Sequence, residues 1–98
     1  MVKLAELIRN GSEELHDAII LLRNPKNINK INEHCVKINS IENYADDVFD
    51  MSIGSLFDEE KDAIKIIKIK DILETLETAT DLCEDAADTI RAIVIKQA

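Results

Sequence analysis

One stretch of this sequence, residues 71–90, reads DILETLETATDLCEDAADTI. It contains no Lys or Arg, and its seven acidic residues fall on one side of a helical wheel, within an arc of about 140°. Another side of the wheel carries apolar or small residues at alternating steps of three and four, as in packed helical bundles. These residues are Leu73, Leu76, Thr80, Cys83, Ala87, Ile90 and Val94. The stretch therefore predicts a long helix with one buried stripe and one acidic stripe.

The acidic stripe has no basic residues to balance it. Acidic side chains four apart on a helix repel each other, and an ordinary solvated face mixes Glu with Lys. Two interpretations follow: a cation supplies the missing positive charge, or the stripe is a solvated face of a chain with formal net charge −8. Composition alone leaves both open.

The length of 98 residues is enough for one small domain, spanning residues 1–98. The chain has two Gly, one Pro, one Tyr and two Phe, so it has few places to turn and few residues that favour strands. We therefore expect an almost wholly helical fold with a core of Ile, Leu, Val and Ala. The acidic balance argues against nucleic acid as a partner, because phosphate binding requires clusters of Lys and Arg.

Several features predict a cytoplasmic, reduced protein. No apolar run reaches the length of a membrane span, and the first ten residues lack the features of a signal peptide. The two cysteines, Cys35 and Cys83, do not make a disulfide framework. Both occupy apolar seam positions, so we expect small buried hydrophobic side chains. A count along antiparallel helices also places them level with each other, which leaves a disulfide as the less favoured alternative.

The sequence predicts helices over residues 2–23, 25–57 and 63–96, joined by short turns into an all-α, up-down-up three-helix bundle. Asn24 before Pro25 is a typical helix start, and Asp62 is a suitable N-cap for the third helix. Gly11 lies on the apolar seam of the first helix. It marks either a close helix crossing or a kink.

A carboxylate interrupts the apolar seam of the second helix at Glu42. Asp46 lies four residues later and shares its face. Counting from a turn near residue 60, position 42 is level with 77 or 78 and position 46 with 73 or 74. Glu74, Glu77 and Asp81 of the third helix should therefore face Glu42 and Asp46. Such a concentration of carboxylates requires protons or a metal, and oxygen-only donors suit Mg²⁺, Ca²⁺, Mn²⁺ or iron.

The two histidines, His16 and His34, lie away from this region and are expected at the surface or its boundary. Their absence from the acidic region argues against a catalytic zinc site and against a ferritin-like di-iron site.

Two segments resemble a known family. Ile41-Glu42-Asn43-Tyr44-Ala45-Asp46-Asp47 is similar to the Glu-x-x-x-Asp motif of PhoU-like phosphate-transport regulators, and to the E-N-x-A-D signature of their DUF47 branch, the Pit accessory proteins. The run of residues 79–88, ATDLCEDAAD, followed by Ile93-Val94-Ile95-Lys96, resembles the ending of that branch. The resemblance extends from about residue 15 to the end of the chain.

The resemblance implies a PhoU-like three-helix half whose Glu/Asp motifs hold metal clusters, often of iron. It implies metal ligands at Glu42, Asp46, Asp81 and Asp85, with Asn43, Glu77 and Asp88 as further candidates. It also implies a regulatory role in inorganic phosphate uptake beside a Pit-type transporter, in the cytoplasm and peripheral to the inner membrane face. Full members are about twice as long, so the partner is expected to be another copy of the chain or an N-terminal bundle that is missing here.

Two other classes of function were weighed. A structural helical interaction module would carry the same acidic face without metal. An enzyme is the weakest hypothesis, because the sequence has no Ser/His or Cys/His pair and no phosphate-binding glycine loop.

Overall fold

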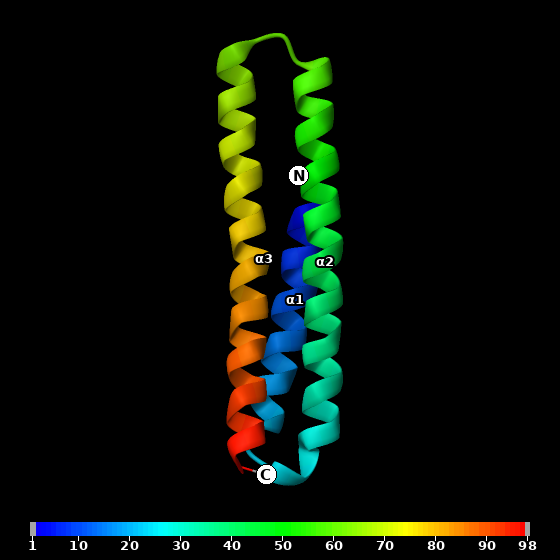
Figure 1. Ribbon diagram of the computed structural model, residues 1–98, viewed down its shortest axis with the longest axis vertical. Coiled ribbons are helices and arrows are strands. Elements are labelled where there is room, and N and C mark those ends of the chain that lie inside the picture. Colours follow the sequence, from blue (N-terminus) through cyan, green and yellow to red (C-terminus); the bar gives the residue numbers. More distant parts are fainter. Residues whose placement is uncertain (1, 98) are drawn as a thin grey trace.

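A computed structural model describes residues 2–97, and within that range it contains three long helices and no strand. The helices are α1 (Val2–Leu21), α2 (Ile28–Glu59) and α3 (Ala63–Gln97), with a short 3₁₀ helix, η1 (Pro25–Asn27), between the first two. Consecutive helices run antiparallel along one axis (Figure 1). The all-α three-helix bundle predicted from the sequence is therefore confirmed.

The first connection is determined by Asn24 and Pro25. A residue before proline is disfavoured in helical conformation, and Asn24 is extended, with φ −127° and ψ 111°. Its side-chain oxygen accepts a hydrogen bond from the backbone N–H of Lys26 at 3.0 Å, so Asn24 caps η1. It does not cap α2 as predicted, because the N-cap residue of α2 is Asn27, whose side chain makes no cap hydrogen bond. The chain forms i→i+3 hydrogen bonds on both sides of this turn. Two predicted ends are therefore wrong by two or three residues: α1 ends at Leu21 and α2 begins at Ile28.

The second connection spans residues 60–62. Glu60 leaves the helix with φ −93° and ψ 132°. The Asp62 carboxylate accepts a hydrogen bond from the backbone N–H of Ile64 at 3.0 Å, as expected of the N-cap of α3. The second helix continues to Glu59 rather than ending at 57. The centre of the turn therefore lies near residue 61, which displaces the register of α3 against α2 by about two residues.

Two apolar clusters form the core. The cluster nearer η1 contains Ala18, Ile31, Cys35, Ile38, Ala87, Ile90 and Val94. The other contains Leu4, Leu7, Ala45 and Leu73. Between them α1 runs without a break through the buried Gly11. A Cβ atom on Gly11 would lie 3.7 Å from Cγ2 of Ile41 and 3.8 Å from Cβ of Cys83, so this glycine marks a close crossing of all three helices.

The first helix is much shorter than its neighbours. It has 20 residues, against 32 in α2 and 35 in α3. At 1.5 Å per residue these lengths are about 30 Å and about 50 Å. Figure 1 shows that the three helices are close together at the η1 end, whereas α2 and α3 continue past the start of α1. We call this uncovered part of α2 and α3, residues 48–73, the arm.

We expect Gly11→Ala to raise the free energy of unfolding by about 0.5–1 kcal/mol, because alanine favours the helix and its methyl group finds ordinary van der Waals contacts. Gly54→Ala is the matched control, since an added Cβ at that mid-helix position meets nothing within 4 Å. Gly11→Leu should instead lower stability by about 1–3 kcal/mol through overpacking. Urea denaturation followed by circular dichroism measures all three. Destabilisation by Gly11→Ala alone would show that the helices cross more closely than described.

Candidate metal centre between α2 and α3

Glu42 occupies a core position of α2. The seam residues on either side, Ile38 and Ala45, are fully buried, and Glu42 itself is only 8% exposed. A carboxylate removed from water is unfavourable unless it is paired, bound to a cation or protonated. The groups around Glu42 therefore decide its charge and its chemistry.

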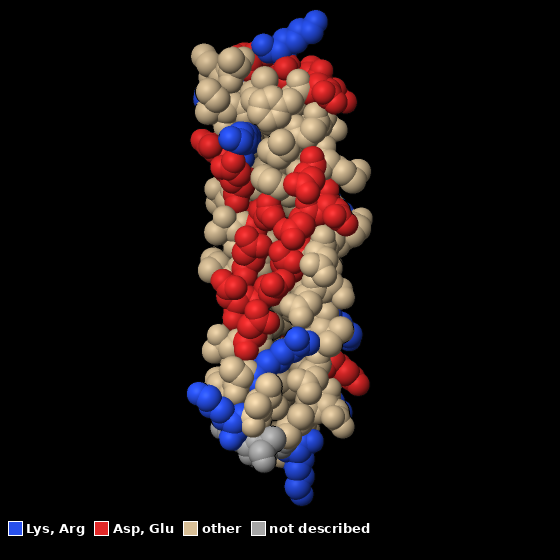
Figure 2. Space-filling model, in the orientation of Figure 1, with Lys and Arg blue, Asp and Glu red and all other residues tan. Residues whose placement is uncertain are grey.

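Two further carboxylates lie beside Glu42. Asp46 follows one turn later on the same face of α2, and Asp81 approaches from α3. One carboxylate oxygen from each of Glu42, Asp46 and Asp81 can be chosen so that all three lie within 4.8 Å of one another. Figure 2 shows acidic side chains gathered in a band over the middle of these two helices. The antiparallel packing of α2 and α3 thus brings oxygen donors from both helices to one place.

Two more acids of α3 complete the group. Glu84 lies within hydrogen-bonding reach of Glu42, and Glu77 lies within reach of Asp46. We call these five residues the carboxylate cluster: Glu42, Asp46, Glu77, Asp81 and Glu84. Asp50, one turn beyond Asp46, adds a further negative charge near Glu77.

Burial and mutual repulsion make two members hard to ionise. Burial, followed by the hydrogen bonds and charges of Glu84 and Asp46, raises the pKa of Glu42 from 4.5 to about 8. Burial also raises the pKa of Glu77 to about 7, with further contributions from the hydrogen bond of Asp46 and the charges of Asp46, Asp81 and Asp50. Near neutral pH the cluster therefore holds protons that solvent-exposed carboxylates would have lost.

No basic side chain neutralises the cluster. Within residues 2–97, Lys3 pairs with Glu6, Lys70 with Glu74, and the two histidines pair with Glu14 and Asp17. None of these ion pairs includes a member of the carboxylate cluster. Protons or a bound cation are thus the remaining ways to offset its negative charge.

The candidate metal ligands predicted from the sequence do not all lie together in the structure. Glu42, Asp46 and Asp81 lie together, with Glu77 beside them. The remaining candidates, Asn43, Asp85 and Asp88, have exposed side chains. The charge of Asp88 acts on Cys35, which belongs to the core cluster nearer η1. The oxygens gathered within 4.8 Å are therefore a subset of those implied by the family resemblance.

Glu84 is a member of the cluster that was not predicted from the sequence, and Glu74, which was predicted to face Glu42 and Asp46, is not a member. Glu74 is exposed and pairs with Lys70, its Oε1 lying 3.5 Å from Nζ, and Glu84 faces Glu42 instead. Part of the cause is the register: the turn lies further along the chain than expected, which moves residues of higher number opposite Glu42. With the turn centred near residue 61, position 42 is level with 80 and position 46 with 76, so the antiparallel count supports Glu77 and Asp81 but does not by itself identify Glu84.

The cysteines and histidines take structural positions. Both cysteines are free thiols. Cys35 is fully buried and its Sγ lies 3.7 Å from the carbonyl oxygen of Ala87, so the predicted level alignment with Cys83 is wrong, for the same reason of register. Burial raises the pKa of the Cys35 thiol, which makes it unreactive. His16 is exposed, and the half-buried His34 pairs with Glu14, as expected of boundary residues.

The donor set fits a hard cation. It consists of carboxylate oxygens, one of them buried, from two rigid helices, which is the chemistry preferred by Mg²⁺, Ca²⁺, Mn²⁺ and iron. A bound cation would replace the protons on Glu42 and Glu77, because metal ligands must be deprotonated. Any metal bound at the cluster would therefore displace protons.

Comparisons with known proteins place this chain beside one bacterial relative. It is 33% identical over 96 residues to the UPF0111 protein YkaA of Bacillus subtilis (strain 168), a match that covers 98% of this chain and 46% of the relative. The chain thus spans about half the length of the curated relative it matches. No family model and no solved structure matches this chain. None of the helices within residues 2–97 combines the length and apolar character of a membrane span.

We expect the metal-free protein to lose stability as pH rises. The pKa values of Glu42 and Glu77 are raised in the folded state, so the folded chain binds more protons than the unfolded chain between pH 4.5 and about 8. The free energy of unfolding should therefore be highest near pH 4.5 and fall through neutral pH. Urea denaturation in EDTA at several pH values measures this dependence.

Glu42→Gln should weaken the dependence of the free energy of unfolding on pH, because glutamine cannot ionise. At about pH 9 it should stabilise the metal-free protein by about 2 kcal/mol. Glu33→Gln, an exposed position on the same helix, is the matched control and should leave the pH profile of the wild type in place. Stability that rises between about pH 5 and about pH 8 in the wild type would contradict the burial of Glu42.

Proposed function

We propose that this chain is a PhoU-like accessory protein of inorganic phosphate transport that holds metal ions on its carboxylate cluster. The observation that carries the proposal is the buried Glu42, whose carboxylate lies with those of Asp46 and Asp81 within 4.8 Å and has no basic partner. Ionised carboxylates held this close together destabilise the metal-free fold. A bound cation would stabilise the fold by neutralising their charge, which explains why such an arrangement exists.

The family resemblance supports the same proposal. Both motifs that resemble PhoU-like proteins contribute to the cluster: Glu42 and Asp46 come from the first, and Asp81 and Glu84 come from the second. The similarity to YkaA extends over both motifs, because it covers 96 residues. The printed name of that relative states no activity, so the role in phosphate transport comes from the resemblance of the motifs.

The proposed ligands are Glu42, Asp46 and Asp81, with Glu77 and Glu84 close enough to complete a cluster. Asp85, Asn43 and Asp88, whose side chains are exposed, are further candidates. The proposed ions are iron, Mn²⁺, Mg²⁺ or Ca²⁺, because all donors are oxygens. Phosphate itself would be repelled by the bare carboxylates, so it would approach only where a metal ion bridges it to the protein.

The proposed role is regulatory rather than enzymatic, at a Pit-type transporter on the cytoplasmic side of the membrane. The chain would act together with a second bundle, supplied by another copy or by a further half such as the longer relative has room for. A second candidate function is a helical interaction module without metal. The raised pKa of Glu42 favours it, because a protonated carboxyl group can remain buried without a cation.

Metal analysis of the purified protein, with thermal unfolding before and after EDTA, tests the proposal. A metal present at 100 times its dissociation constant should raise the free energy of unfolding by about 2.7 kcal/mol. Glu42→Gln with Asp46→Asn should abolish this stabilisation and, in EDTA, should make the protein more stable than wild type. Glu33→Gln with Asp71→Asn, both at exposed positions outside the cluster, is the control with the same change of charge.

The outcomes separate the two functions. Metal-dependent stability that the cluster variant loses and the control retains supports the metal centre. A wild type that carries no metal and is not stabilised by iron, manganese, magnesium or calcium would contradict the metal centre. That result would support the helical interaction module without metal. In that case the cluster variant should still be more stable than wild type, since the repulsion that it removes does not depend on metal.

A further inference from the structure

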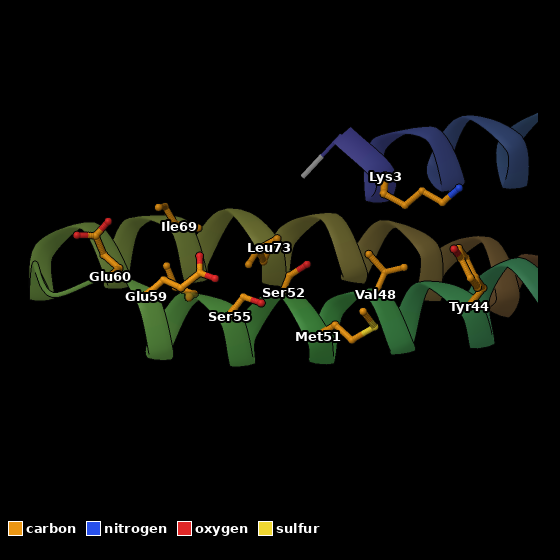
Figure 3. Close-up of a pocket in the computed structure, with 11 residues that line it drawn as sticks. Lys3, Tyr44, Val48, Met51, Ser52, Ser55, Glu59, Glu60, Ile69 and Leu73 are labelled. Carbon is orange, nitrogen blue, oxygen red and sulfur yellow. The ribbon is translucent and has the colours of Figure 1, made fainter.

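A groove runs along the arm on the side where α1 stops. Figure 3 shows the groove between α2 and α3, with the start of α1 at one end and the turn at residues 60–62 at the other. Its apolar lining comes from Val48, Met51, Leu56, Ile69 and Leu73.

The groove continues the surface that α1 covers elsewhere in the bundle. Below the start of α1, Leu4 fills the space between the two longer helices and packs in one cluster with Ala45 and Leu73. Above it, no element within residues 2–97 takes that place, and Met51 is 72% exposed. Of the apolar lining, Met51 is exposed, Val48 and Ile69 are half-buried, and Leu56 and Leu73 are buried. The apolar surface open to a further helix is therefore centred on Met51.

The two ends of the groove carry opposite charges. Lys3 lines the end at the start of α1, where its Nζ lies 5.3 Å from the centre of the Tyr44 ring. Glu59 and Glu60 line the opposite end, beside the turn. An antiparallel two-fold contact brings each end of a surface against the opposite end of its copy, so this pattern is self-complementary.

We propose that the groove binds the arm of a second copy of this chain, antiparallel to the first. Each arm takes the place that α1 leaves empty in the other copy, and the four helices of the two arms form a four-helix bundle. Glu59 and Glu60 of each copy lie against Lys3 of its partner. The arm extends about 20 Å beyond α1, so the buried area is at the low end for a specific interface and the dimer is concentration-dependent.

Sedimentation velocity from about 5 to about 500 µM protein tests the proposal by measuring the mass of the particle. The buffer contains EDTA, because a metal ion could otherwise bridge the acidic faces of two copies. The mass should rise from that of the 11.0 kDa monomer to twice that value. Met51→Glu should weaken association by about tenfold or more, because it buries a charge in the apolar contact. Ile67→Glu is the matched control: Ile67 is on the arm and 60% exposed, but does not line the groove, and its substitution should leave the dimer intact.

Charge exchange tests the antiparallel orientation. Lys3→Glu and Glu59→Lys should each weaken self-association by about two- to fivefold or more. Their combination in one chain should restore it, and mixing the two single variants should give a heterodimer. Circular dichroism establishes that each variant is folded. A wild type that remains monomeric throughout, or a dimer unaffected by Met51→Glu and by both charge variants, would overturn the proposal and leave the groove to a different occupant.

Discussion

The burial of a carboxylate within the helix–helix seam is the constraint on which the structure depends. Glu42 lies between Ile38 of one apolar cluster and Ala45 of the other, so the core is divided at its level. The only other buried polar side chain among the residues that the structure describes, Thr80, donates its hydroxyl to the carbonyl oxygen of Glu77 at 2.7 Å. The threonine is thus satisfied locally, whereas Glu42 is surrounded by other acids. Its position therefore places a carboxyl group that is hard to ionise within a packing seam.

Local chemistry made most of the fold predictable. The caps at Asn24 and Asp62 and the alternating seams of the long helices depend on residues close in sequence, and all of them are found. The level of one helix against another depends on where a turn is centred, and a difference of about two residues is half a helical turn. That difference separated Cys35 from Cys83, whereas Glu74 is absent from the cluster because it pairs with Lys70. The existence of an acidic site was thus predictable, but its full membership was not.

The arm shows a second limit of sequence periodicity. The seam of α2 continues through Phe49, Ser52 and Leu56, with the same spacing as in the three-helix part. The spacing of apolar residues predicts which face of a helix is apolar, but it does not predict how many neighbouring helices cover that face. The difference in helix length, together with the short connection between α1 and α2, places the uncovered part of α2 and α3 beside the turn at residues 60–62.

The groove and the carboxylate cluster lie on different sides of α2. Asp46 faces the cluster, and Val48, two residues later and therefore about 200° around the helix, lines the groove. Figure 2 accordingly shows the acidic band on a face that α1 does not cover. Binding of a cation on one side need not displace a helix from the other. The two sites therefore share the backbone of α2 while their side chains lie on separate faces, so a substitution in one site leaves the side chains of the other unchanged.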